Sequence, residues 1–76
     1  MNRNQFSVYQ YFRSGHCETV CRLESIERAG KIVDLLMRSV GARAGFVNRI
    51  IITDGADEVA WEWKHGEGII CPPIEE

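Results

Sequence analysis

The sequence lacks most of the features that would assign a chemistry to it. Its 76 residues include only two prolines, two histidines and three cysteines. An odd number of cysteines cannot form a complete disulfide framework, which argues against a disulfide-based secreted scaffold. No run of about 18 apolar residues is present, as a transmembrane helix would need, and residues 1–5 open no secretory signal region. We therefore expect a cytoplasmic protein without a membrane span.

An excess of one charge is missing as well. Nine lysines and arginines stand against eleven aspartates and glutamates, which gives a net charge of −2. Because non-specific binding to nucleic acid depends on an excess of cations, a nucleic-acid partner is disfavoured. A local basic patch would need Arg38, Arg43 and Arg49 on one face.

The length predicts a single domain over residues 1–76, with a core at about 6–65 and a C-terminal tail at 66–76. A domain of this size buries only about 60% of the surface that its unfolded chain exposes. Oligomerisation is one of the usual supplements in such small proteins.

Residues 6–12 and 17–24 alternate in hydrophobicity as the two strands of a hairpin would. A two-residue turn at positions 14–15 aligns the apolar sides of both strands, as a buried face requires. The predicted pairs are Phe12–Cys17, Gln10–Thr19, Val8–Cys21 and Phe6–Leu23.

A helix is expected between Ser25 and Gly45. Ser25 is a good N-cap because its hydroxyl can accept a free backbone N–H of the first turn. Gly45 is the expected C′ residue, where glycine adopts the left-handed conformation easily. Gly30 is expected to allow a close approach to the sheet, and Gly41 to weaken the end of the helix. The apolar residues at helical spacing are Ile26, Ala29, Val33, Leu36, Met37, Val40 and Ala44.

Residues 47–53 and 58–64 form the second predicted hairpin. A tight turn at positions 54–55 would set isoleucines opposite acidic residues, whereas a four-residue loop over 54–57 aligns apolar side chains with one another. We therefore predict the four-residue loop, with the pairs Ile52–Val59, Ile50–Trp61 and Arg49–Glu62. The segment Ile69–Cys71 either adds a short edge strand or covers one end of the core.

The order of the elements predicts an α+β fold, ββαββ, in which two β-hairpins flank one amphipathic helix. One helix can cover only one face of the four-stranded sheet. We place it on the more apolar face, which carries Phe6, Val8, Phe12, Cys17, Cys21, Leu23, Ile50, Ile52, Val59, Trp61 and Trp63.

This layout, together with the runs Ile-Ile-Ile-Thr-Asp-Gly at 50–55 and Trp-Glu-Trp-Lys-His-Gly-Glu-Gly-Ile-Ile-Cys-Pro-Pro at 61–73, resembles a group of small uncharacterised bacterial proteins. These are built as hairpin–helix–hairpin, and some are carried on mobile gene cassettes. The resemblance implies the fold and carries over no catalytic residue.

The residues that are chemically suited to bind zinc are His16, Cys17, Cys21, His65 and Cys71. On one strand, however, the Cα atoms of Cys17 and Cys21 lie about 13 Å apart, too far for one metal or for a disulfide. We expect no metal and no cofactor.

Catalytic residues are not assigned either. Both histidines lie at strand ends away from any nucleophile motif, and turn chemistry accounts for Asp54 and Asp57 better than a cation site does. A chain this short also leaves little room for a pocket of about 300–1,000 Å³. We expect a protein that is not an enzyme.

The face opposite the helix is the candidate for an interaction. Trp61 and Trp63 are expected in the core, whereas Tyr9 and Tyr11 lie on the mixed face, and tyrosine and arginine are enriched at protein interfaces. Exposed edge strands also favour association. The candidate interface residues are Tyr9, Tyr11, Arg13, Val20, Arg22 and Ile51.

We therefore expect a small non-enzymatic interaction module that self-associates as a homodimer, with another protein as a further class of partner. The alternative is a module that binds a small ligand or nucleic acid in a groove at the dimer interface. Such a groove would need an electropositive, aromatic-lined concavity around Arg13, Arg22 and Arg49.

Overall fold

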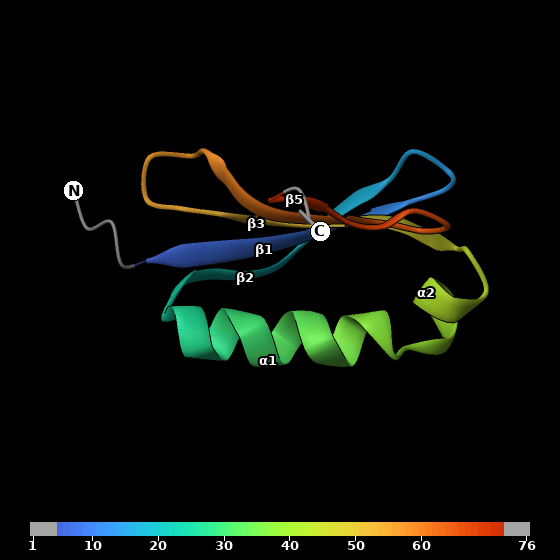
Figure 1. Ribbon diagram of the computed structural model, residues 1–76, viewed down its shortest axis with the longest axis horizontal. Helices are drawn as coiled ribbons and strands as arrows, with labels where there is room; N and C mark the ends of the chain where they lie inside the picture. Colours follow the sequence, from blue (N-terminus) through green and yellow to red (C-terminus); the bar gives the residue numbers. More distant parts are fainter. Residues whose placement is uncertain (1–4, 73–76) are drawn as a thin grey trace.

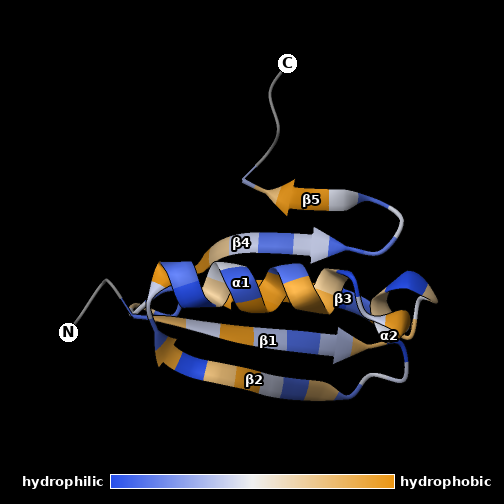
Figure 2. Ribbon diagram, turned by 90° about the horizontal axis from the view of Figure 1, so that it is seen from below, coloured by the Kyte–Doolittle hydropathy of each residue, from blue (hydrophilic) through white to orange (hydrophobic). Residues whose placement is uncertain are grey.

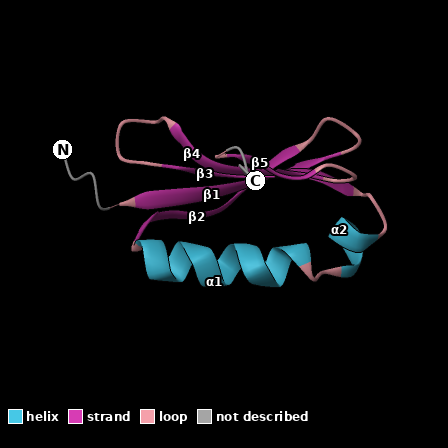
Figure 3. Cartoon of the chain, viewed as in Figure 1, coloured by secondary structure: helices cyan, strands magenta, loops and turns pink. Residues whose placement is uncertain are grey.

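A computed structural model describes residues 5–72 as one antiparallel sheet with its helices on one face (Figures 1 and 3). The strands follow the order β2-β1-β3-β4-β5. The elements are β1 (Phe6–Phe12), β2 (Cys17–Glu24), α1 (Ile26–Met37), α2 (Val40–Arg43), β3 (Val47–Thr53), β4 (Val59–Lys64) and β5 (Gly68–Cys71).

The α+β class with helices on a single face is confirmed, but the sheet has five strands and not four. The fifth strand, β5, lies in the segment that we assigned to a tail and confirms the short edge strand that was one of two alternatives for residues 69–71. The sheet therefore continues to Cys71. Residues 73–76 of that predicted tail lie outside the described residues.

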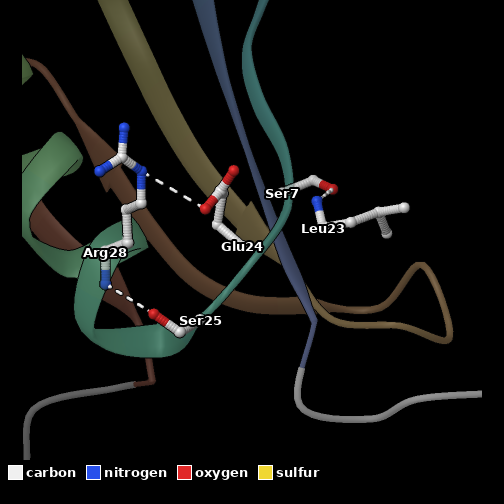
Figure 4. A network of polar contacts seen from close by, with 5 residues as sticks. All are labelled: Ser7, Leu23, Glu24, Ser25 and Arg28. Atoms are coloured by element: carbon white, nitrogen blue, oxygen red, sulfur yellow. Dashed lines mark hydrogen bonds and ion pairs between the residues drawn. The ribbon is translucent and has the colours of Figure 1, made fainter.

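The predicted start of the helix is confirmed. Ser25 caps α1, because its hydroxyl accepts the backbone N–H of Arg28 at 3.2 Å (Figure 4). The guanidinium of Arg28 also pairs with Glu24 at 3.3 Å, and the hydroxyl of Ser7 accepts the backbone N–H of Leu23. These contacts join the end of β2 to the start of α1.

The helix ends earlier than predicted because a second cap interrupts it. The hydroxyl of Ser39 donates to the carbonyl of Leu36 at 2.6 Å and accepts the backbone N–H of Ala42 at 3.2 Å. α1 therefore stops at Met37 and the short α2 begins after Ser39. Gly45 follows α2 with φ +86°, as predicted for a C′ residue.

The first hairpin turns differently from the prediction. The backbone N–H of Phe12 donates to the carbonyl of His16 at 2.8 Å, so three residues and not two form the turn. Gly15 occupies the left-handed region at φ +97°, as the last position of such a turn requires.

The longer turn shifts the register of β2 by one residue near the hairpin end. Tyr11 now lies opposite Cys17, which moves this cysteine to the face away from the helices. A bulge at Val20 then restores the predicted pair of Val8 with Cys21. The longer turn explains why the predicted pairs Phe12–Cys17 and Gln10–Thr19 were wrong. The predicted pair Phe6–Leu23 was wrong because a second irregularity, with Leu23 at φ +57°, places Phe6 opposite Glu24.

The second hairpin closes with a similar three-residue turn. The backbone N–H of Asp54 donates to the carbonyl of Glu58 at 2.9 Å, and Asp57 takes the left-handed position at φ +61°. The carboxylate of Asp54 accepts the N–H groups of Ala56 and Glu58, the turn role expected for this residue.

The predicted four-residue loop was wrong, and the shorter turn and a bulge at Ala60 each shift the register by one residue, so the partners of both tryptophans move by two. Ile52 pairs with Trp61 and Ile50 with Trp63, so the predicted partners were wrong while the predicted face of the tryptophans was right. Val59 lies opposite Thr53, on the other side of the sheet from the predicted one.

The helical layer covers only part of the sheet. α1 packs against β1 and β2, and α2 packs against β3, while β4 and β5 extend beyond the helices (Figure 2). The buried core accordingly lies under α1 and α2, and its members are Val8, Ala29, Val33, Ala42, Val47, Ile50 and Ile52.

The glycines of the helical layer provide a test of this packing. A Cβ added at Gly30 would meet nothing within 4 Å, so the predicted close approach there was wrong. We expect Gly30→Ala to raise the free energy of unfolding by about 0.5–1 kcal/mol through helix propensity. Gly45→Ala should lower it by about 1 kcal/mol or more, since φ is positive there and the new Cβ would lie 3.2 Å from the ring of His65.

Urea denaturation of the two variants, side by side with the wild type, measures both effects. A destabilised Gly30→Ala variant would mean that α1 lies close enough to the sheet for a Cβ at position 30 to clash.

Candidate functional site

Three of the predicted interface residues, Tyr9, Tyr11 and Ile51, share the sheet face away from the helices. Tyr9 lies directly opposite Ile51, and Tyr11 lies opposite Arg49. Although no helix covers this outer face, Ile51 is only 5% exposed. The surrounding side chains therefore shield the isoleucine, and the outer face is largely closed by its own residues.

Arg49 is central to that closure. Its guanidinium lies 4.9 Å from the centroid of the Tyr11 ring, and its Nε donates to the carboxylate of Glu62. The predicted Arg49–Glu62 ion pair thus forms, although Glu62 is diagonal to Arg49 and not directly opposite it. The hydrogen bond to Glu62 raises the pKa of Arg49 further above its usual range. The positive charge of Arg49 is therefore paired with a carboxylate of the same chain.

Tyr11 also lies directly opposite Cys17, which we had expected in the core. Burial raises the pKa of Tyr11 above its ordinary value, and the neighbouring Cys17 raises it further. The arrangement follows from the one-residue register shift, because Cys17 would otherwise point to the helix side.

The remaining interface candidates lie elsewhere. Val20 packs against the core, since the bulge turns it to the helix side, so its predicted place on the outer face was wrong. Arg22 is exposed on β2, and Arg13 lies at the first turn, with its guanidinium 5.4 Å from the centroid of the Phe46 ring. The structure does not gather Arg13, Arg22 and Arg49 into one concavity.

The local basic patch that would have needed Arg38, Arg43 and Arg49 on one face is not assembled either. Arg38 pairs with Asp34 at 3.3 Å, Arg43 lies on α2, and Arg49 lies on the outer face.

The two histidines have aromatic neighbours. The ring centroid of His16 lies 5.8 Å from that of Phe12, and that of His65 lies 6.2 Å from that of Trp63. Over residues 5–72, no three His, Cys, Asp or Glu side chains are grouped closely enough to hold a metal ion. No helix in that range has the length and hydropathy to cross a membrane.

A second surface, which the sequence did not reveal, lies on the helix side of β4 and β5. We call Trp61, Trp63 and Ile69 the tryptophan strip, since Ile69 lies directly opposite Trp63. Both tryptophans touch the core but are only half-buried, and Ile69 is 38% exposed. A helix about 10–12 Å wide spans only two or three strands spaced about 4.8 Å apart, which leaves this strip without a cover.

Comparisons of this chain with protein-family models, curated proteins and solved structures gave no match. The resemblance to small bacterial hairpin–helix–hairpin proteins therefore stays a prediction.

The cysteines test the unexpected register of β2. Cys17 is exposed on the outer face, whereas Cys21 is half-buried against the core, and burial raises the pKa of its thiol. Since the thiolate is the reactive form, we expect a thiol reagent at pH 8 to label Cys17 at least tenfold faster than Cys21.

Single-cysteine variants, with serine at the other two positions, measure the two rates by mass spectrometry. Equal rates, or faster labelling of Cys21, would contradict the described register.

Proposed function

We propose that this protein is a small non-enzymatic interaction module that self-associates as a homodimer through the tryptophan strip. The observation that supports the proposal most is the uncovered helix-side face of β4 and β5 beside α1 (Figure 2). Partly exposed tryptophans on an uncovered sheet face are consistent with a protein interface, where aromatic residues are enriched.

The dimensions of the layers favour a second copy of this chain as the partner that covers the tryptophan strip. Two sheets pack face to face about 10 Å apart, and a helix with its side chains is about 10–12 Å thick. The β4–β5 half of a second copy would therefore occupy the same layer as α1 and lie against its flank. If a two-fold axis relates the two copies, a single contact covers the tryptophan strips of both.

The expected affinity is modest. A stable interface buries about 800 Å² on each partner, and two short strands present less than that. We therefore expect a dimer that dissociates in the micromolar to millimolar range. Pairing between the β5 edges of two copies adds little to the affinity, because this strand has four residues and is followed by Pro72.

The variant Ile69→Lys tests the interface, because a charge within the strip must be desolvated when the copies meet. Sedimentation velocity up to 1 mM protein, in 0.5 M NaCl, should show a wild-type monomer–dimer equilibrium. We expect the variant to raise the dissociation constant at least tenfold. Leu35→Lys is the matched control, since Leu35 is 68% exposed on α1 outside the strip, and it should leave the dimer unchanged.

Two results would contradict the proposal. A wild type that is strictly monomeric at 1 mM would exclude self-association of this strength. A dimer weakened by Tyr11→Glu but not by Ile69→Lys would place the interface on the outer face instead.

A further inference from the structure

Exposed apolar side chains gather at the two ends of the molecule, whose longest dimension is 36 Å. Val40, which is 81% exposed, and Phe46 lie at the end formed by α2 and the turns after β1 and β4 (Figure 1). Leu23 and Ile26 lie at the opposite end, where β2 meets α1. Each end therefore presents apolar surface to the solvent.

The end with α2 is basic, and we call it the basic pole. It carries Arg13, Arg43 and Lys64, and none of the three forms an ion pair within the described part of the chain. The carboxylate in the adjacent turn is that of Glu67, while Arg38 and Asp34 neutralise each other.

A hollow of about 260 Å³ opens at the basic pole, lined by Phe12, Arg13, Ser14 and Phe46. The Arg13 guanidinium lies over the Phe46 ring, so a cation and an exposed aromatic surface stand side by side. A second, more open hollow joins Val40 to Arg43. Both hollows thus combine one arginine with apolar side chains.

The opposite end is acidic, and we call it the acidic pole. It carries Glu27 at the start of α1 and Asp57 and Glu58 at the turn after β3. Among residues 5–72, the opposing cation is Arg22 at the end of β2, because Arg28 is already paired with Glu24. This pole therefore has the charge that complements the basic pole.

We propose that the basic pole of one copy docks on the acidic pole of another, head to tail. Arg13 and Arg43 would face the carboxylates of Glu27 and Glu58, while Phe46 and Val40 meet Ile26 and Leu23. Such a contact is heterologous, so each copy keeps one free pole and assembly continues beyond two copies. It uses surfaces separate from the tryptophan strip, and either contact can exist without the other.

Two charge-reversal variants test the proposal in the Ile69→Lys background, where the strip is disabled. R13E/R43E leaves both poles acidic, and E27K/E58K leaves both poles basic. We expect neither double variant to associate alone, and an equimolar mixture to associate again, in sedimentation velocity at 20 mM NaCl and up to 1 mM protein. Raising the salt to 0.5 M should weaken the mixed assembly at least tenfold, because screening is strong at that ionic strength.

Lys31→Glu is the matched control, since Lys31 is exposed in the middle of α1 away from both poles, and it should not change the association of the parent. Circular dichroism verifies that every variant is folded. A mixture that stays monomeric, or a parent protein that does not associate at low salt, would overturn the head-to-tail contact. Neither result bears on the salt-resistant dimer of the tryptophan strip.

Discussion

The pairing of β1 with β3 is the contact on which the rest of this structure depends. It joins the two hairpins into one sheet, from Ser7 opposite Thr53 to Phe12 opposite Val47, and it places Val8 beside Ile52 under the helices. The chain between the two strands, which includes β2 and both helices, must then cross one face of the sheet. The remaining strands, β4 and β5, can only extend that sheet outward, beyond the reach of α1.

Because the helices cover only part of the sheet, both tryptophans are buried on one side and exposed on the other. They contact the core from one side and remain open to the solvent on the other, because α1 spans the strands next to them and not their own. On the outer face, which no helix covers, Arg49 stacks on Tyr11 and pairs with Glu62, and Ile51 is buried on the same face. The protein therefore closes one uncovered surface with its own side chains and leaves the tryptophan strip open to the solvent.

Local signals in the sequence predicted the elements well. The bounds of β1, β2 and β3, the cap at Ser25 and the C′ position of Gly45 all follow from patterns of a few residues. The registers could not be predicted in the same way, because they depend on the turn type and on bulges at Val20 and Ala60 that no periodicity reveals. The tryptophan strip was missed for a related reason, since it follows from the strand order.

The helical layer leaves β4 and β5 uncovered, and tryptophan fluorescence tests this arrangement directly, because both tryptophans of the chain lie on β4. In 0.5 M NaCl at low micromolar concentration, we predict a red-shifted emission that acrylamide quenches efficiently. At millimolar concentration the emission should shift to the blue and the quenching constant should fall as the strip is covered. A blue-shifted emission that resists acrylamide even in dilute solution would contradict the account, because both tryptophans would then be fully buried within a single copy.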